Sequence, residues 1–329
     1  MTTQPAAPFP PADSADSLPC SRGWDAQDTP AWGTASPAAF WLAVEEPGPW
    51  GRKAFTQSRL DPHVGARLEK ETQAAGGRAL LIRSPGDRRD TAEGAPRRVF
   101  LAGGMASGQP WLLQGLFVDP GVLLHLPWEA IASADAETAR ASAHAVLPEL
   151  GVCATPLLLV CTNGKRDVCC AVRGRALAGY LAGQRGPWVW ECTHTGGHRF
   201  APTGVALPSG ATYARLDPPL ALAAVDAEQH GRIAAGALGE RHLRGLAHLS
   251  GPEQAADAWV RAACGETSVT ALRLAPCGGE GEERTYDVTH VDGRAWRVVV
   301  RAHTQTGPPV SCGGEQVAST SYAVREIAT

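Results

Sequence analysis

The chain has 329 residues, of which 44% are hydrophobic and 19% charged, and this composition excludes a protein that is disordered throughout. Thirty lysine and arginine residues against 33 aspartate and glutamate residues give a net charge of −3, without a long run of either sign. Nothing in this balance indicates a nucleic-acid partner.

Targeting and redox signals place the chain in a reducing compartment. Residues 1–17 lack the basic head and apolar core of a secretory signal, and no apolar run is long enough to span a membrane. The nine cysteines are an odd number in a large chain, which fits a disulfide scaffold poorly. We therefore expect a cytoplasmic protein that is not membrane-bound, in which clustered thiols serve metal or redox chemistry.

The first half of the chain predicts a tail and an α/β domain. Residues 1–35 are rich in proline and are expected to form a disordered tail. Residues 36–151 are expected to form an N-terminal α/β domain of unassigned role. Its predicted elements, in chain order, are a strand at 39–44, a helix at 60–75, strands at 79–83, 98–102 and 115–118, and a helix at 136–147.

The second half, residues 152–329, predicts another α/β domain. The unbroken apolar run LLLVC at 157–161 is typical of a strand buried on both faces. The elements predicted after it are a helix at 168–182, strands at 188–192 and 212–216, a helix at 226–238 with Asp226 as N-cap, and a helix at 252–264. Segments 285–290 and 294–303 alternate around Asp292-Gly293, which predicts a C-terminal β-hairpin.

Four side chains have the types and spacing of metal ligands. Cys161 ends the apolar strand, Cys170 lies in the first turn of the next helix, and His194 and His198 follow the next strand as HTGGH. Two thiolates and two imidazoles suffice for a tetrahedral zinc ion or for a [2Fe–2S] cluster with two ligands on each iron. The C-x8-C spacing is wider than a zinc knuckle and suits two irons better.

The predicted topology brings these segments together. A right-handed crossover places strands 157–161 and 188–192 side by side, so Cys161 and the HTGGH segment leave the sheet at the same end. The helix N-terminus brings Cys170 there, and its dipole favours a thiolate. The adjacent glycines Gly196 and Gly197 allow positive φ and a close approach of the backbone.

The segments LLLVCTNGKRDVCCAVRGRALA (157–178) and ECTHTGGHRFAPTGVALPSGATY (191–213) resemble the sucrase/ferredoxin-like family, relatives of the thioredoxin-like [2Fe–2S] ferredoxins. Weaker similarity extends to WLAVEEPGPWG and VSCGGE. The resemblance implies a thioredoxin-like ferredoxin fold for residues 152–329. It also implies a bis-histidinyl, Rieske-like [2Fe–2S] cluster with Cys161, Cys170, His194 and His198 as ligands. Many relatives have histidine where this chain has Asn163, so no role carries over to that position.

The charges of this ligand set predict the chemistry. Two thiolates and two neutral imidazoles leave the oxidised cluster neutral, whereas four thiolates leave it negative, so the histidine-ligated cluster accepts an electron more easily. The second nitrogen of each imidazole can carry a proton, and electron transfer is then coupled to proton transfer. Lys165, Arg166 and Arg199 add positive charge if they face the cluster.

Other cysteines compete for the same role. Cys169 adjoins Cys170 and is a second-rank ligand, because adjacent helical residues point about 100° apart. Cys192 is also second-rank, since it shares a strand face with His194 if the strand persists. Cysteines without a partner at ligand spacing are expected to be packing residues: Cys153, Cys264 and Cys277. Cys312, in SCGG, is assigned either packing or contact with the cluster edge or a partner.

The function we expect is electron transfer between a reductase and an unidentified acceptor protein. Two alternatives use the same four ligands: a zinc-stabilised structural or interaction module, and a redox or pH sensor. A sucrase needs two carboxylates that flank the sugar bond, and the sequence gives no basis for choosing such a pair. The electron donor, the acceptor and the oligomeric state stay open.

Overall fold

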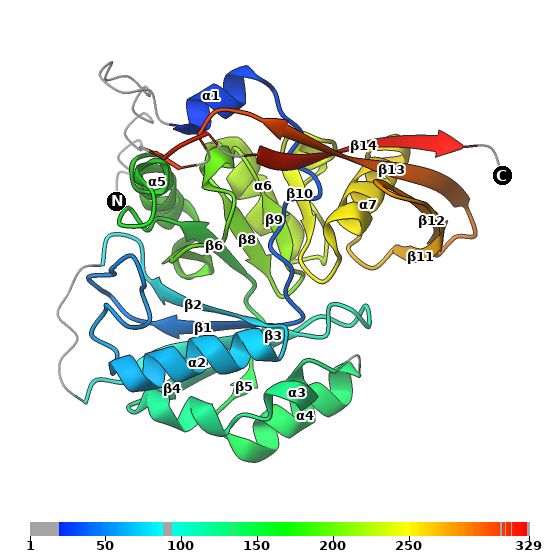
Figure 1. Cartoon of the computed structure of the whole chain (residues 1–329). Helices are drawn as coiled ribbons and strands as arrows, with labels where there is room; N and C mark the ends of the chain where they lie inside the picture. Colours follow the sequence, from blue (N-terminus) through cyan, green and yellow to red (C-terminus); the bar gives the residue numbers. More distant parts are fainter. Residues whose placement is uncertain are drawn as a thin grey trace, which may run out of the picture.

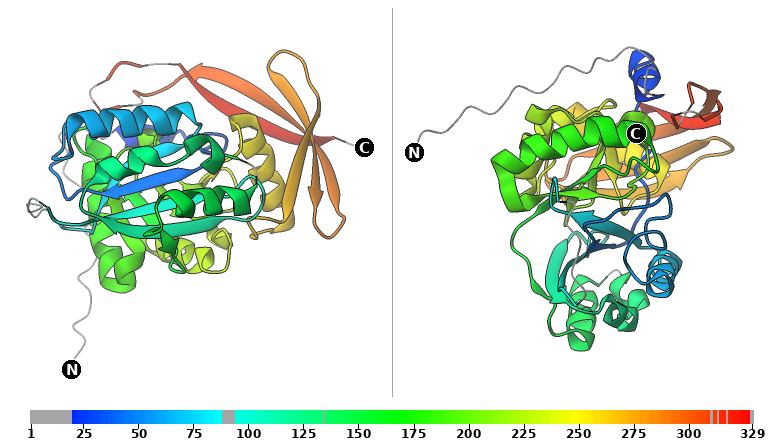
Figure 2. Two further views of the ribbon diagram at one scale, coloured as in Figure 1. Left: turned by 90° about the horizontal axis from the view of Figure 1, so that it is seen from below. Right: turned by 90° about the vertical axis from the view of Figure 1, so that its left-hand side faces the viewer.

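The computed structural model of the chain describes residues 20–87, 94–133, 135–309, 311–312, 314–316 and 318–327. Their strands form a ten-stranded sheet in the order β10-β9-β8-β6-β7-β2-β1-β3-β4-β5, and a four-stranded sheet in the order β11-β12-β13-β14. Figure 1 shows the large sheet within the body of the molecule, and Figure 2 shows the small sheet extending away from it. The mixed α/β class predicted from the sequence is confirmed.

The first half of the chain builds one end of the large sheet. Its strands are β1 (Trp41–Glu45), β2 (Arg78–Arg83), β3 (Arg97–Gly103), β4 (Trp111–Phe117) and β5 (Gly151–Val152). Its helical elements are α2 (Pro62–Ala74), η1 (Pro120–His125), α3 (Trp128–Ile131) and α4 (Ala136–Val146), with α2, α3 and α4 on one side of the strands in Figure 1. Side chains alternate along β1, so Leu42 packs on Leu68 of α2 while Trp41 packs toward the second half.

The second half adds the other end of the large sheet. Its strands are β6 (Leu157–Cys161), β7 (Val189–Cys192), β8 (Gly204–Leu207), β9 (Ala211–Tyr213) and β10 (Leu243–Leu246). Its helical elements are η2 (Cys170–Gly174), α5 (Arg175–Arg185), η3 (Gly186–Trp188), η4 (His198–Phe200), α6 (Pro218–Glu228), η5 (Ala235–Ala237) and α7 (Gly251–Cys264). Among the described residues, no helix combines the length and apolar character needed to cross a lipid bilayer.

The large sheet is continuous across the domain boundary predicted between residues 151 and 152. β2 pairs with β7, with Ile82 opposite Cys192, and apolar residues from both halves share one buried cluster. Because this strand pairing joins both halves in one sheet, the division into two domains stays a prediction. The thioredoxin-like fold of residues 152–329 also stays a prediction.

The small sheet enlarges the predicted C-terminal hairpin. β12 (Glu283–His290) and β13 (Ala295–Thr306) pair around Asp292-Gly293, as expected. β11 (Leu272–Gly278) and β14 (Ala318–Ile327) then add a strand on either side. Helix α7 contacts both β10 of the large sheet and the strands of the small one, which joins the two sheets.

The prediction of a disordered tail over residues 1–35 is wrong for residues 20–35, and residues 1–19 lie outside the described part. Helix α1 (Cys20–Ala26) begins the described chain, and Trp24 within it is fully buried. The Trp24 ring meets Phe200 edge to face, with ring centroids 6.4 Å apart. The proline-rich composition predicted disorder, but this short segment is ordered by contacts with distant residues rather than by its own helix propensity.

The helix predicted at 226–238 is also misplaced. Helix α6 begins at Pro218, where the Asp217 carboxylate accepts the backbone N–H of Leu220 and two prolines occupy the first helical positions. Asp226 instead lies near the end of α6 and pairs with Arg185 of α5. Asp217 and the prolines form the stronger start signal, because proline has the helical φ and lacks an N–H that would need a partner.

Glu228 at the end of α6 is a buried acid. Its carboxylate accepts the backbone N–H and the hydroxyl of Ser209, at 2.8 and 2.7 Å. Burial raises the pKa of Glu228 from 4.5 to about 7, despite these hydrogen bonds. The stability that this group adds is therefore fully present below pH 4.5 and is lost as the pH rises through about 7.

Substituting Glu228→Gln is expected to remove this pH dependence. The free energy of unfolding of the variant, minus that of the wild type, should increase by about 2 kcal/mol between about pH 5 and about pH 8. Chemical denaturation at both pH values measures the change, with exposed Glu282→Gln as the control. An equal difference at the two pH values would contradict the prediction.

Candidate metal centre

The candidate centre lies where two parallel strands end together. β6 pairs in parallel with β7, and the last residues of the two strands, Cys161 and Cys192, stand opposite each other. The chain then continues from β7 into the HTGGH segment. The predicted convergence of Cys161 and the histidine segment at one sheet end is therefore confirmed.

The helix after β6 brings the second cysteine to Cys161. Cys170 begins the π-helical turn η2, which continues into α5, and its thiol hydrogen-bonds to the Cys161 sulfur. Gly174 makes the close approach possible, because a Cβ at this position would lie 2.2 Å from the carbonyl oxygen of Cys161. Both cysteines are 1% exposed. A π-helical turn of this kind often marks a functional site.

The two histidines sit on a loop with two left-handed glycines. Gly196 and Gly197 have φ of 82° and 69°, as the sequence led us to expect, and a Cβ at Gly197 would meet the guanidinium of Arg244 at 2.5 Å. The rings of His194 and His198 are 5.2 Å apart between centroids. His194 also hydrogen-bonds to the Cys161 sulfur. The structure thus brings together all four side chains predicted as ligands.

Two arginines that the sequence reasoning missed support this loop. Arg78 of β2 donates to the carbonyl oxygen of His194 at 3.4 Å, and Arg244 of β10 donates to that of Gly196 at 3.0 Å. Arg244 is 1% exposed, and burial lowers its pKa to about 9. Arg244 could have been identified from the sequence, because it stands inside the otherwise apolar strand LRGL and a buried guanidinium requires several hydrogen-bond acceptors.

The cations that the sequence suggested are placed differently. Lys165 and Arg166 are exposed in the loop after β6. The guanidinium of Arg199 lies over the ring of Phe200, 4.6 Å from its centroid, and 5.3 Å from that of Trp24. Arg199 therefore fixes α1 to the histidine loop.

The local electrostatics prepare a thiolate and a neutral imidazole. Hydrogen bonds from Cys170 first, and then from His194 and the backbone of Thr195, hold the pKa of Cys161 well below its ordinary value. The neighbouring Cys161 sulfur and burial raise the pKa of Cys170. Burial lowers the pKa of His198 despite the nearby Asp167 carboxylate. The neutral imidazole is the form that binds a metal.

The donor set fits a metal group, because several of its nitrogen atoms are buried without a hydrogen bond to the described residues. In the described part of the chain, Nδ1 of His194 and both ring nitrogens of His198 are buried without a hydrogen bond. Buried polar atoms of this kind are costly unless something satisfies them. Two sulfurs and these nitrogens are the donors of a [2Fe–2S] site with mixed ligands.

A second group of potential metal-ligating side chains includes Cys169, the neighbour of Cys170. Among the described residues, the donors that lie within 4.8 Å of one another in groups of three or more belong to Cys20, Asp167, Cys169 and Cys312. Cys161, Cys170, His194 and His198 form no such group.

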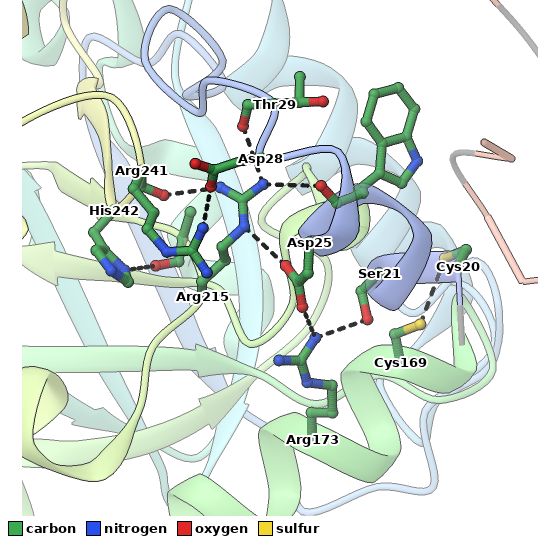
Figure 3. A network of polar contacts seen from close by, with 12 residues as sticks. Cys20, Ser21, Asp25, Asp28, Thr29, Cys169, Arg173, Arg215, Arg241 and His242 are labelled. Atoms are coloured by element: carbon green, nitrogen blue, oxygen red, sulfur yellow. Dashed lines mark hydrogen bonds and ion pairs between the residues drawn. The ribbon is translucent and has the colours of Figure 1, made fainter. Parts of the chain in front are cut away.

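The second-rank cysteines take other positions. Cys169 points toward Cys20, as Figure 3 shows, and the two sulfurs are 3.4 Å apart. Cys192 is fully buried, and burial raises the pKa of its thiol. The buried thiol of Cys153 donates to the carbonyl oxygen of Thr155. Cys264 is half-buried and Cys277 is exposed.

A buried ion pair holds together the strand ends at which the candidate centre lies. Arg83 of β2 donates to Glu191 of β7 at 2.8 Å, and both side chains are almost fully buried. The same carboxylate accepts the hydroxyl of Thr162, the residue after Cys161, at 2.7 Å. Coulomb attraction from Arg83 lowers the pKa of Glu191 against the opposing effect of burial. These bonds fix the ends of β2, β6 and β7 relative to one another.

Comparison with known proteins gives one match. Residues 31–245 match the sequence model of the sucrase/ferredoxin-like family. This span covers more than half of the chain and contains Cys161, Cys170, His194 and His198, while Cys20 and Cys312 lie outside it. No curated protein and no solved structure matches the chain.

The contact between Gly174 and Cys161 allows a steric test. Gly174 has an ordinary helical backbone, with φ −69° and ψ −41°, so Gly174→Ala adds only the clash with the Cys161 carbonyl. We expect this variant to lose about 1–3 kcal/mol of stability and to retain less bound metal, because the helix must move away from β6. Urea unfolding and metal analysis measure the two effects.

Two glycines of α5 provide matched controls. A Cβ at Gly179 or Gly183 meets nothing within 4 Å. Alanine at either position should stabilise the protein by about 0.5–1 kcal/mol, as alanine generally does inside a helix. If Gly174→Ala behaved like these controls, the close packing of η2 on β6 would be wrong.

Proposed function

The chain belongs to the sucrase/ferredoxin-like family, and from this premise we propose that it is an electron-transfer protein with a [2Fe–2S] cluster bound by Cys161, Cys170, His194 and His198. The observation that carries the proposal is the meeting of two buried thiols with ring nitrogens that make no hydrogen bond to the described part of the chain. In this proposal, single electrons pass between a reductase and an acceptor protein in the cytoplasm.

When bound, a [2Fe–2S] cluster with two histidine ligands supplies one-electron transfer at a higher potential than an all-cysteine cluster. The residues of the chain divide the site into a buried and a more accessible side. The two cysteines are almost fully buried, whereas His194 and His198 are partly exposed. We therefore propose that electrons and protons are exchanged on the histidine side.

Fixed positive charge supports reduction at this site. The guanidinium groups of Arg78 and Arg244 are held on carbonyl oxygens of the histidine loop. Arginine keeps its charge in proteins even where burial lowers its pKa. A positive charge that cannot move away favours the addition of an electron nearby, and burial strengthens the effect because water screens it less.

A basic pocket beside His194 supports an acidic redox partner. The pocket has a volume of about 250 Å³, and its charged lining consists of Arg52, Lys53, Glu69, Arg78 and Arg166. The cations outnumber the single acid. A partner with acidic groups around its own redox centre matches this charge, and complementary charge raises the rate of encounter between proteins.

Ligand substitution tests the cluster. We expect anaerobically purified wild-type protein to contain about two irons and two sulfides per chain, with visible absorption and, after dithionite reduction, a Rieske-like EPR spectrum. Alanine at Cys161, Cys170, His194 or His198 should abolish or strongly alter both spectra, because each change removes a proposed ligand.

Cys192→Ala is the matched control for these variants. Its side chain is buried opposite Cys161, but we propose no bond from it to iron, so iron and sulfide should stay at the wild-type level. No cluster recovered on reconstitution of protein from iron-replete cells, together with bound zinc that is lost on Cys161→Ala or Cys170→Ala, would overturn the proposal and favour a zinc-stabilised module.

Coupling to protons is the second part of the proposal. An imidazole that binds iron through one nitrogen keeps the other for a proton, and His198 Nε2 lies 3.9 Å from the Asp167 carboxylate. Where one proton accompanies the electron, the potential should fall by about 59 mV per pH unit as the pH rises. Protein-film voltammetry from about pH 6 to pH 10 measures this slope. A potential that is flat over this range would exclude the coupling.

A further inference from the structure

A second group of sulfurs lies outside the proposed cluster site. The sulfurs of Cys20 and Cys169 are 3.4 Å apart, those of Cys169 and Cys312 are 3.0 Å apart, and those of Cys312 and Cys20 are 3.5 Å apart. The three come from the start of α1, from the residue before η2, and from the segment between β13 and β14. Figure 3 shows Cys20 and Cys169 pointing toward each other.

A buried carboxylate completes the group. Asp167 Oδ1 lies 3.6 Å from the Cys312 sulfur, and the donor atoms of all four side chains lie within 4.8 Å of one another. The side chain of Asp167 is fully buried, and in the described part of the chain it forms no ion pair with a lysine or arginine. Its oxygens accept the backbone N–H groups of Cys169 and Cys312 and the hydroxyl of Ser311, which fixes their orientation.

Packing alone explains this arrangement poorly. A buried cysteine usually packs as a small hydrophobic residue among hydrocarbon. Among the described residues, the apolar cluster here consists of the three cysteines and Ala201, and a carboxylate lies against it. A disulfide joins two sulfurs and leaves the third thiol beside the buried carboxylate, whereas all three pairs of sulfurs are at similar distances.

We propose that Cys20, Cys169, Cys312 and Asp167 bind one Zn²⁺ ion. Three sulfurs and one oxygen are a suitable tetrahedral donor set, and at a Zn–S distance of about 2.3 Å neighbouring sulfurs stand about 3.8 Å apart. The observed separations require only a small outward movement of the side chains. Binding displaces the three thiol protons to solvent, while Asp167 binds as the carboxylate. This site does not depend on the proposed electron transfer.

The ion would join three distant parts of the chain. The cysteines are 149, 143 and 292 residues apart in sequence. Helix α1 is also held by Asp25, which pairs with Arg173 and Arg215, both visible in Figure 3. Zinc therefore adds a further attachment of α1, and it joins Cys312 to the loop that precedes Cys170.

The test is metal analysis of the full-length, cluster-loaded protein purified anaerobically from zinc-replete cells. We expect about one zinc per chain, with X-ray absorption at the zinc edge showing about three sulfurs near 2.3 Å and one oxygen. Cys20→Ala and Cys312→Ala should each lower the zinc content at least about tenfold, because three ligands hold zinc far less tightly than four. Both variants should keep the iron and the visible spectrum.

Cys264→Ala and Cys277→Ala are controls, because these cysteines lie outside the group, and they should retain zinc. A zinc chelator should lower the melting temperature of the wild type but not that of Cys20→Ala. Each protein is compared with itself, with and without the chelator, so a lower stability of the variant does not affect the result. Zinc-free wild type, or zinc retained in Cys20→Ala and Cys312→Ala, would overturn the zinc site alone. Zinc lost only from Cys161→Ala would place the ion in the first site and overturn both proposals.

Discussion

The parallel pairing of β6 with β7 is the constraint on which the candidate centre depends. Its register sets Cys161 opposite Cys192, so the chain leaves β7 toward the histidine loop at the point where β6 ends. Helix η2 reaches the same point only because Gly174 has no side chain to keep it from the Cys161 carbonyl. A shift of one residue in this register would turn Cys161 to the other face of the sheet.

The rest of the structure holds this strand end in place and gives it its charge. The buried pair of Arg83 and Glu191 joins β2 to β7 on one side, and Arg244 holds the histidine loop on the other. Asp167 lies between the group of Cys20, Cys169 and Cys312 and the histidine loop, since its carboxylate contacts Cys312 and also stands 3.9 Å from His198 Nε2. A metal ion bound in one proposed site would therefore change the electrostatics of the other.

Local patterns placed Cys161 at the end of a continuous apolar strand and the HTGGH segment after the next strand, and the structure brings the two segments together at one end of the sheet. The parts that could not be predicted depend on long-range contacts. Helix α1 is ordered by Arg173 and Arg215, far along the chain, and the three sulfurs of Cys20, Cys169 and Cys312 share no sequence spacing. Asp226 looked like a helix cap because its distant partner, Arg185, cannot be identified from the local sequence.

Nitrogen hyperfine spectroscopy of the reduced protein tests most directly whether His194 and His198 bind iron. With a histidine-ligated cluster, electron–nuclear double resonance should show strong couplings to two ring nitrogens, which change in the expected ratio when histidine is labelled with nitrogen-15. His194→Ala or His198→Ala should remove one of the two couplings. A reduced cluster whose spectrum contains no strongly coupled histidine nitrogen would contradict the assignment of these four ligands.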